Sequence, residues 1–305
     1  MNKKILIAVL SLSLITPVVA KAEPMQQPTV AVLDTALDTT IPAFKDKVVY
    51  EACVLEWNSC PNGQSLMEGP GSAFMPIKLM QQNSFQHGTQ MVSALIKTNP
   101  NAKIVFVRII GATSTGTRQI ANEATFVKAL DWVIANKDRL NIQAVSMSQG
   151  HHNLPNVADY CPKTVSTQAR IKTLVSAGVP VFLPAGNTRD YKKIDWPACI
   201  DDSISVGAST DYEEIPVWSN VDINKTDFYA LGVMRLLGPG NIESNQVGTS
   251  ISAQVAAANW IALKTAKPTY TYQQLYDTFK KTSVSISNPK ALRGNMMYLQ
   301  GALNG

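Results

Sequence analysis

One serine of this chain stands where a serine could act as a nucleophile. Ser250 follows a glycine-led turn, Gly248-Thr249, and runs into the alanine-rich stretch 255–258, which predicts a buried helix that begins near the serine. A serine hydroxyl is a weak nucleophile at its free pKa and needs a neighbouring base, which itself needs an orienting group. Taken alone, a serine at this position is more simply a helix cap.

Histidine is scarce, and this narrows the candidates for the base. His151 and His152 form an adjacent pair, whereas His87 stands alone before an apolar stretch that predicts a helix. His87 is therefore the leading base candidate. The simpler interpretation is a surface histidine with no chemical role.

Two further polar residues follow apolar runs that predict buried strands. Asp34 ends the run 29–33, and Asn187 comes shortly after the run 179–183. The carboxyl ends of parallel strands meet at one edge of a sheet, which is where ligands bind in such folds. Each residue alone is ordinary turn chemistry. Together they predict a single site.

The elements that must position these residues alternate along the chain. Apolar runs predict strands over 29–33, 103–110, 142–147, 179–183 and 203–207. Helices are predicted over 124–134, from Cys161-Pro162 to Gly178, from Ser250 onward and over 272–280. Strands that alternate with helices predict an α/β fold with a mostly parallel central sheet and helices on both faces.

The N-terminus has the pattern of an export signal. Lys3 and Lys4 precede the apolar run 5–15, and small residues follow at Ala20-Lys21-Ala22. We expect a signal peptide over 1–22 and a single domain over 23–305 with no membrane span. The protein is then exported, either secreted or periplasmic.

Charge and composition exclude one class of partner. The formal net charge of +5 falls to about +2 when the three lysines of the signal peptide are removed. No basic stripe with interleaved aromatic residues is present, so we expect no nucleic-acid partner. Charged residues make up 16% of the chain, which is low enough to indicate a large buried core.

The four cysteines of an exported chain predict two disulfides, for which three connectivities exist. We favour Cys53 with Cys60, which closes a short loop, and Cys161 with Cys199. Their spacing lacks the paired C-x-x-C pattern of a zinc site. We expect both disulfides to be structural and none of the four cysteines to bind a metal.

Five segments together resemble the subtilisin-like serine proteases, or subtilases. They occur in the family's order and span most of the chain: 30–35 (VAVLDT), 87–92 (HGTQMV), 146–148 (SMS), 184–187 (PAGN) and 248–250 (GTS). The order Asp, His, Ser along the chain is the order found in subtilisin. The resemblance implies a three-layer subtilisin-like fold.

The resemblance also implies roles for the residues singled out above. Ser250 would attack a peptide carbonyl, His87 would take and return the proton, and Asp34 would orient the imidazole. The side-chain amide of Asn187 would form an oxyanion hole with the backbone N–H of Ser250.

Two segments match the family's substrate-binding edges. Ser148, Gln149 and Gly150 match the segment that lines the first pocket, and Ser114, Thr115 and Gly116 roughly match the opposite edge. Within the first segment, Gln149 occupies a place where the family often has an apolar residue. Either segment could instead be an ordinary Ser/Gly loop.

The chain departs from the family pattern at several places. Ala36 replaces a usual glycine, Gln254 replaces a usual proline, and Ile41 replaces a usual histidine. Only 23–28 separates the expected cleavage point from the first strand, so we expect no N-terminal prodomain. A separate inhibitor or chaperone protein could then restrain the enzyme.

We expect no catalytic cofactor. Family members often bind structural calcium, but no ligand set can be matched, and Asp201, Asp202 and Asp222 are more simply solvated loop charges.

The main hypothesis is an exported serine endopeptidase that cleaves proteins or peptides through an acyl-enzyme. The alternative is a catalytically silent subtilase-fold protein that binds peptides or partners. A serine esterase of the α/β-hydrolase type requires Gly-x-Ser-x-Gly and the order Ser, Asp, His, and the chain has neither.

Overall fold

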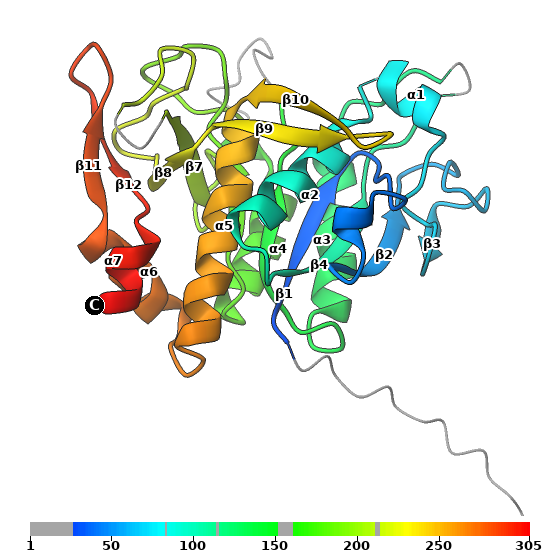
Figure 1. Cartoon of the computed structure of the whole chain (residues 1–305), viewed down its shortest axis with the longest axis horizontal. Coiled ribbons are helices and arrows are strands. Elements are labelled where there is room, and N and C mark those ends of the chain that lie inside the picture. The colour runs from blue at the N-terminus through cyan, green and yellow to red at the C-terminus, as the bar shows by residue number, and fades with distance from the viewer. Residues whose placement is uncertain (1–26, 83, 114–115, 152–160, 211–213) are drawn as a thin grey trace, which may run out of the picture.

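The five strands predicted from apolar runs form the middle of one ten-stranded sheet in the computed structural model of the chain (Figure 1). The strand order is β11-β12-β8-β7-β6-β5-β1-β4-β2-β3. The middle strands run parallel, and only the outer pairs β2–β3 and β11–β12 are antiparallel. The structure describes residues 27–82, 84–113, 116–151, 161–210 and 214–305, so the predicted signal peptide lies outside it.

The strands of the large sheet have the following bounds: β1 (Thr29–Asp34), β2 (Val48–Val54), β3 (Leu66–Glu68), β4 (Lys103–Arg108), β5 (Ile142–Met147), β6 (Val181–Pro184), β7 (Ile204–Ser209), β8 (Phe228–Leu231), β11 (Val284–Ser287) and β12 (Arg293–Met296). A second sheet consists of β9 (Val233–Gly238) and β10 (Ile242–Val247). The helices are α1 (Ile77–Gln82), α2 (His87–Thr98), α3 (Glu123–Asn136), α4 (Val165–Ser176), α5 (Thr249–Ala266), α6 (Tyr272–Thr282) and α7 (Leu299–Asn304), with 3₁₀ turns η1 (Pro42–Phe44) and η3 (Cys161–Lys163).

Strand β1 shows why the fold has three layers. All six of its residues are buried, as expected for a central strand covered on both faces. Successive side chains of a strand point to opposite faces. Val30 and Val32 belong to the cluster that includes residues of α2 and α5, whereas Ala31 and Leu33 belong to the cluster that includes residues of α3 and α4. The predicted α/β fold with helices on both faces is confirmed.

Helix α5 is buried along most of its length, since 13 of its 18 residues are buried. Its alanine run is completely covered, and the helix packs against α2 and against strands β5 to β8. Small side chains allow this close approach. A helix that is apolar on nearly all sides is typical of the core of a large domain.

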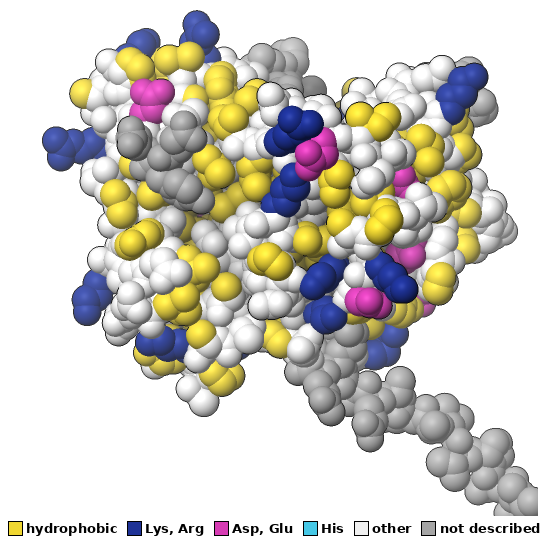
Figure 2. Space-filling view, viewed as in Figure 1, with side chains coloured by type: hydrophobic (Ala, Val, Ile, Leu, Met, Phe, Trp, Pro, Cys, Tyr) yellow, Lys and Arg dark blue, Asp and Glu magenta, His cyan; other side chains and the backbone are white. Residues whose placement is uncertain are grey.

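The hairpin of β9 and β10 covers α2 on the outside of the molecule (Figure 1). The Leu237 backbone N–H donates to Ser93 Oγ at 3.0 Å, and Lys97 Nζ lies 2.6 Å from Glu243 Oε1. Figure 2 shows the basic side chains of this face spread singly or in small groups. Among the described helices, none is long and apolar enough to cross a membrane.

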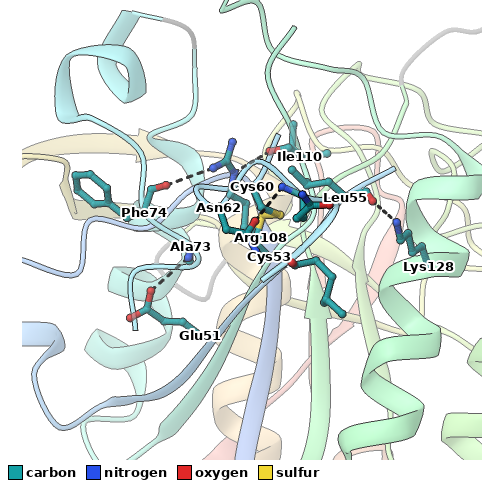
Figure 3. The surroundings of a disulfide bond; sticks show 12 residues. Glu51, Cys53, Leu55, Cys60, Asn62, Ala73, Phe74, Arg108, Ile110 and Lys128 are labelled. Carbon is teal, nitrogen blue, oxygen red and sulfur yellow. Dashed lines mark hydrogen bonds between the residues drawn. A yellow bond between two sulfur atoms is a disulfide. The ribbon is translucent and has the colours of Figure 1, made fainter. Parts of the chain in front are cut away.

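The structure contains two disulfides, with the pairings favoured from the sequence. Cys53 of β2 is bonded to Cys60 in the following loop (Figure 3), and Cys161 is bonded to Cys199. One helix boundary was predicted wrongly beside the second bridge. The helix expected to open at Cys161-Pro162 begins at Val165, because a separate 3₁₀ turn occupies 161–163.

Two charged side chains hold the loop that leads toward α2 (Figure 3). Glu51 Oε2 accepts backbone hydrogen bonds from Gly71 at 3.1 Å and Ala73 at 3.3 Å. Burial raises the pKa of Glu51, and these two hydrogen bonds lower it in part. Arg108 Nη1 donates to the Phe74 carbonyl at 3.3 Å, and burial lowers the pKa of Arg108 to about 10.

Candidate active site

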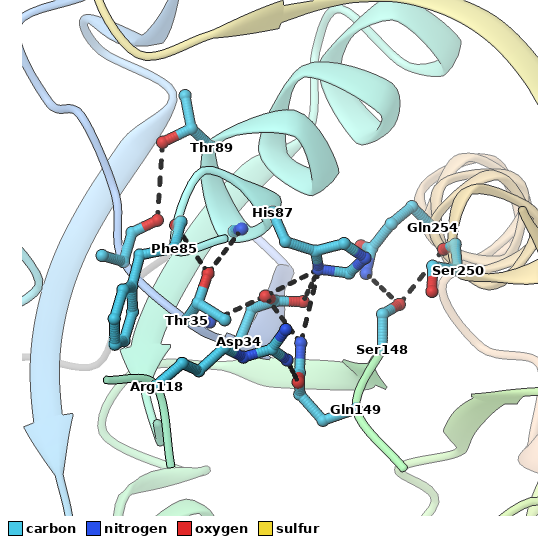
Figure 4. A network of polar contacts seen from close by, with 12 residues as sticks. Asp34, Thr35, Phe85, His87, Thr89, Arg118, Ser148, Gln149, Ser250 and Gln254 are labelled. Atoms are coloured by element: carbon cyan, nitrogen blue, oxygen red, sulfur yellow. Dashed lines mark hydrogen bonds and ion pairs between the residues drawn. The ribbon is translucent and has the colours of Figure 1, made fainter. Parts of the chain in front are cut away.

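Asp34 and His87 meet at the carboxyl end of β1 (Figure 4). His87 Nδ1 lies 2.8 Å from Asp34 Oδ1 and 3.0 Å from Oδ2. The Asp34 side chain is fully buried, whereas that of His87 is 28% exposed. A carboxylate only accepts hydrogen bonds, so Nδ1 carries the proton and Nε2 of the neutral ring is left as an acceptor. The pair thus has the geometry of an oriented base.

Thr35 fixes the start of α2 against the end of β1. Its backbone N–H donates to Asp34 Oδ1 at 2.7 Å, and its hydroxyl donates to the Phe85 carbonyl at 2.7 Å. The same hydroxyl accepts the Gly88 N–H at 2.9 Å. A Cβ on Gly88 would lie only 2.6 Å from the Ala36 carbonyl oxygen, so glycine is required where the two elements touch.

Ala36 is accommodated without strain, although the family usually has glycine there. It is fully buried, and it is not among the residues with positive φ. Its carbonyl accepts the Thr89 hydroxyl at 3.4 Å. This departure therefore leaves the positions of Asp34 and His87 intact.

Ser250 is the second residue of α5 and lines the same pocket as His87. The pocket has a volume of about 270 Å³ and lies where β5 and β6 end. Gly248, with φ of 155°, turns the chain from the β9–β10 hairpin into the helix. The first N–H groups of a helix have no acceptor within it, so the Ser250 N–H is available to a ligand.

The Asn187 amide is held in one orientation by Thr249. Asn187 Oδ1 accepts from the Thr249 N–H at 2.9 Å and from the Thr249 hydroxyl at 3.0 Å. The hydroxyl in turn accepts the Gly186 N–H at 3.0 Å. Because its oxygen is engaged in this way, the amide has its N–H₂ group left for the pocket that Asn187 and Ser250 both line.

Ser148 connects the end of β5 to the start of α5. Its hydroxyl donates to the Ser250 carbonyl at 3.1 Å and accepts from Gln254 Nε2 at 3.1 Å. Gln254, which replaces the family's usual proline, is fully buried in α5. The glutamine is thus part of the support of the nucleophile helix, a role that was not predicted from the sequence.

Of the two segments predicted to bind substrate, the structure places only the first in the pocket. Ser148, Gln149 and Gly150 line the pocket. Ser114 and Thr115 lie outside the described residues, and Gly116 closes a turn by donating its N–H to the Thr113 carbonyl at 2.9 Å. The same loop brings Arg118 into the pocket. A single arginine in a polar loop has no sequence signal that would have revealed this.

The acidic loop residues considered for a metal make local contacts. Asp201 pairs with Lys225, and Asp222 Oδ1 accepts the Asn224 N–H at 3.0 Å. Within the described ranges, no three side chains of His, Cys, Asp or Glu gather as a candidate metal site. The expectation of no catalytic cofactor stays a prediction, and structural calcium has no assigned ligands.

An imidazole held by a buried carboxylate, a serine at a helix start and a fixed amide line one pocket at the carboxyl edge of a parallel sheet. These groups and this fold together define the class of α/β proteins with a serine-hydrolase type of site. Within that class, the chain belongs to the subtilase family, whose model matches residues 26–301.

Individual relatives are distant. Subtilisin NAT of Bacillus subtilis subsp. natto is 24% identical over 232 residues, which cover 72% of this chain and 56% of that protein. Subtilisin E of Bacillus subtilis strain 168 matches to the same extent. The chain thus spans little more than half the length of these curated relatives.

Solved structures confirm the fold. A protease from Pseudoalteromonas arctica superposes with a TM-score of 0.68 at 20% identity, covering 92% of this chain and 89% of the other. A lanthipeptide protease superposes with a TM-score of 0.69 at 16% identity, covering 91% and 88%. The subtilisin-like fold is therefore shared over nearly the whole chain.

Proposed function

We propose that this chain is a serine endopeptidase that hydrolyses peptide bonds of protein or peptide substrates through an acyl-enzyme. The observation that carries the proposal is the His87–Asp34 contact of 2.8 Å in the pocket that Ser250 also lines. Membership of the subtilase family supports the same reaction class.

The proposed reaction uses groups of this chain and one water molecule. Ser250 Oγ attacks the substrate carbonyl carbon while His87 Nε2 takes the hydroxyl proton. The Asn187 amide and the Ser250 N–H stabilise the oxyanion. When the C–N bond breaks, His87 gives its proton to the leaving amine. Water then attacks the ester with His87 as base, and Ser250 recovers its proton.

The surroundings of the protein belong to the same proposal. The basic, apolar and small-residue pattern of 1–22 favours export, to the medium or to the periplasm. An active protease needs restraint before it reaches that compartment, and a separate inhibitor or chaperone protein is the proposed means. Co-expression with such a partner would raise the yield of folded protein but leave the mature enzyme's turnover unchanged.

The direct test is labelling by a fluorophosphonate probe. The purified protein is treated with the probe and digested, and the label is mapped by mass spectrometry beside casein and ester assays. We expect label on Ser250, casein cleavage, and loss of both in Ser250→Ala with unchanged circular dichroism. An unlabelled, folded protein would instead support the silent peptide-binding alternative, and ester turnover without casein cleavage would favour an esterase.

A further inference from the structure

The side chain of Gln149 lies between the Asp34–His87 pair and Arg118 (Figure 4). Gln149 Nε2 donates to Asp34 Oδ1 at 2.9 Å and lies 3.3 Å from His87 Nδ1. On its other side, Arg118 Nη2 donates to Gln149 Oε1. Gln149 is only 4% exposed, so this amide is a buried part of the site.

The chemistry of the two neighbours allows one orientation of this amide. A guanidinium only donates hydrogen bonds and a carboxylate only accepts them. The oxygen of Gln149 must therefore face Arg118, and its nitrogen must face Asp34. If the amide rotated by half a turn, both contacts would become unfavourable. Arg118 thus acts as a lock on the direction in which Gln149 donates.

Asp34 Oδ1 consequently accepts three hydrogen bonds, from the Thr35 N–H, His87 Nδ1 and Gln149 Nε2. Hydrogen bonds to a charged group inside a protein are stronger than those between neutral groups. The Gln149 bond reaches the carboxylate from the segment that follows β5, whereas Thr35 directly follows Asp34 at the end of β1. The carboxylate is held from two elements, and its rotation away from the imidazole is opposed.

Arg118 also contributes charge. Burial lowers the pKa of the Arg118 guanidinium, and the nearby Asp34 carboxylate raises it in part. The positive charge faces the carboxylate through the Gln149 amide. The chain thus supplies a hydrogen-bond donor, Gln149, at a place that is often apolar in the family, with a cation beside it.

We propose that Gln149, locked by Arg118, is a positioning residue that holds the Asp34 carboxylate in line with His87. The inference rests on the proposed function and goes beyond it, because Gln149 was expected only to line a substrate pocket. An apolar residue at this place would fill the same space without donating to Asp34.

The kinetic test uses Gln149→Leu and Arg118→Met, each purified to a folded state. The matched control is Gln273→Leu, because exposed Gln273 of α6 also donates to an aspartate, Asp277 Oδ1, at 2.8 Å. The rate of inactivation by the fluorophosphonate probe is measured over a range of probe concentrations. This gives two constants, the maximal rate of inactivation and the probe concentration at half-saturation. A loss of one bond to a carboxylate predicts a maximal rate for Gln149→Leu that is lower by on the order of tenfold to a hundredfold.

The half-saturating concentration should change by less than about twofold, because the proposed role is in the reaction and not in binding. The control Gln273→Leu should match the unmodified protein in both constants. A raised half-saturating concentration with an unchanged maximal rate would overturn the proposal and make Gln149 a substrate-pocket residue.

A double-mutant cycle tests whether Arg118 acts through Gln149. Because Arg118 acts mainly by locking the amide, adding Arg118→Met to Gln149→Leu should slow the maximal rate by a smaller factor than Arg118→Met does alone. Multiplied effects of the two changes would show that Arg118 acts independently and would overturn the lock. Arg118→Met also serves as the second variant if Gln149→Leu fails to fold.

A spectroscopic measurement separates this inference from the protease proposal. The Nδ1 proton of His87, bonded to Asp34, should give a proton resonance far downfield, assigned by its loss in His87→Gln. We expect Gln149→Leu and Arg118→Met to shift or broaden it and Gln273→Leu to leave it unchanged. The resonance can be measured without substrate turnover, so this experiment tests the positioning role even if the protein proves inactive. An identical resonance in Gln149→Leu would refute the positioning role.

Discussion

At the scale of single residues, the site consists of side chains whose hydrogen-bond partners allow only one orientation of the side chain. Nδ1 of His87 must carry a proton because Asp34 only accepts, and the Asn187 oxygen is occupied by two donors of Thr249. The roles of Asp34, His87, Ser250 and Asn187 could be proposed from the sequence because each has a distinct residue type beside an element boundary.

The first prediction concerns the oxyanion donor. Asn187→Ala should lower turnover of casein-derived peptides by about a hundredfold to a thousandfold, the loss established for the equivalent donor of subtilisin itself. Stability should fall by about 1 to 2 kcal/mol, because the contacts of Asn187 Oδ1 to the Thr249 N–H and hydroxyl are lost at the start of a helix. Steady-state kinetics and urea unfolding measure the two effects.

Asn245→Ala is the matched control for this prediction, because Asn245 is exposed on the β9–β10 hairpin. It should change neither turnover nor stability. Equal turnover in Asn187→Ala and the unmodified protein would remove Asn187 from the oxyanion hole.

The roles of Gln149 and Gln254 could not have been predicted in this way. Gln149 and Asp34 are 115 residues apart, and Gln254 and Ser148 are 106 residues apart. Their hydrogen bonds depend on how β5 and α5 pack, and no local pattern of residues encodes that packing. Both places were identified from the sequence only as departures from the family.

At the scale of elements, the sequence predicts the strands that are buried on both faces of the sheet. It does not predict the strands that are largely exposed. Strands β1, β4 and β6 are largely continuous apolar runs, and β5 and β7 are rich in small and apolar residues, so the burial of these strands is visible in the sequence. Strand β10 reads IESNQV and is mostly exposed. Its conformation comes from pairing with β9, which itself packs on α2, so it carries no periodic signal of its own.

The contact between α2 and the end of β1 leads to the second prediction. Gly88→Ala should lower the free energy of unfolding by about 1 to 3 kcal/mol, because the new Cβ meets a backbone oxygen and the Phe106 ring. Urea unfolding in the Ser250→Ala background, which prevents self-cleavage, measures the change. Gly238→Ala is the control, since the nearest atom to its Cβ lies at 3.5 Å.

Gly88→Ala should also reduce labelling of Ser250 by the fluorophosphonate probe in the otherwise unmodified protein. Helix α2 begins at His87, and any shift that relieves the contact moves the imidazole. A variant of unchanged stability and labelling would show that the two elements separate without cost.

The third prediction concerns pH and the loop held by Glu51. Because burial raises the pKa of Glu51 above its usual 4.5, the folded protein binds this proton more tightly than the unfolded chain. Its contribution to stability is then complete below the unfolded pKa and is lost as pH rises through the folded pKa. Relative to Glu51→Gln, the unmodified side chain should lose stability as pH rises.

Urea midpoints measured from about pH 4 to about pH 7 in the Ser250→Ala background test this. Glu243→Gln provides a control of opposite sign, because the hydrogen bond from Lys97 lowers the pKa of Glu243. That contribution is present above the unfolded pKa and is lost as pH falls. Parallel pH profiles for the two variants would contradict the assigned directions.

At the scale of the whole molecule, two disulfides close loops of very different length. Cys53 and Cys60 are separated by 7 residues, and Cys161 and Cys199 by 38. In the chain-entropy description, a longer closed loop restricts the unfolded chain more and so stabilises the fold more. The fold could be predicted at this scale because the subtilase segments span most of the chain.

The fourth prediction is that the two bridges differ in strength. Replacing Cys161 and Cys199 by serine should cost about 4 kcal/mol, and replacing Cys53 and Cys60 about 2.5 kcal/mol. Urea unfolding in the Ser250→Ala background gives both values, and the Cys53/Cys60 variant serves as the comparison. A larger loss for that variant would mean that loop length does not determine the effect.

The burial of α5 has a consequence for the order in which the protein is made. A ribosome that has synthesised the first 240 or so residues has produced Asp34, His87 and Asn187 but not Ser250, and the space beside α2, over strands β5 to β8, is still unfilled. The nucleophile therefore arrives on the same helix that completes this half of the core. Under the proposed function, a nascent or partly translocated chain cannot cleave its neighbours, and catalytic competence begins only when α5 docks.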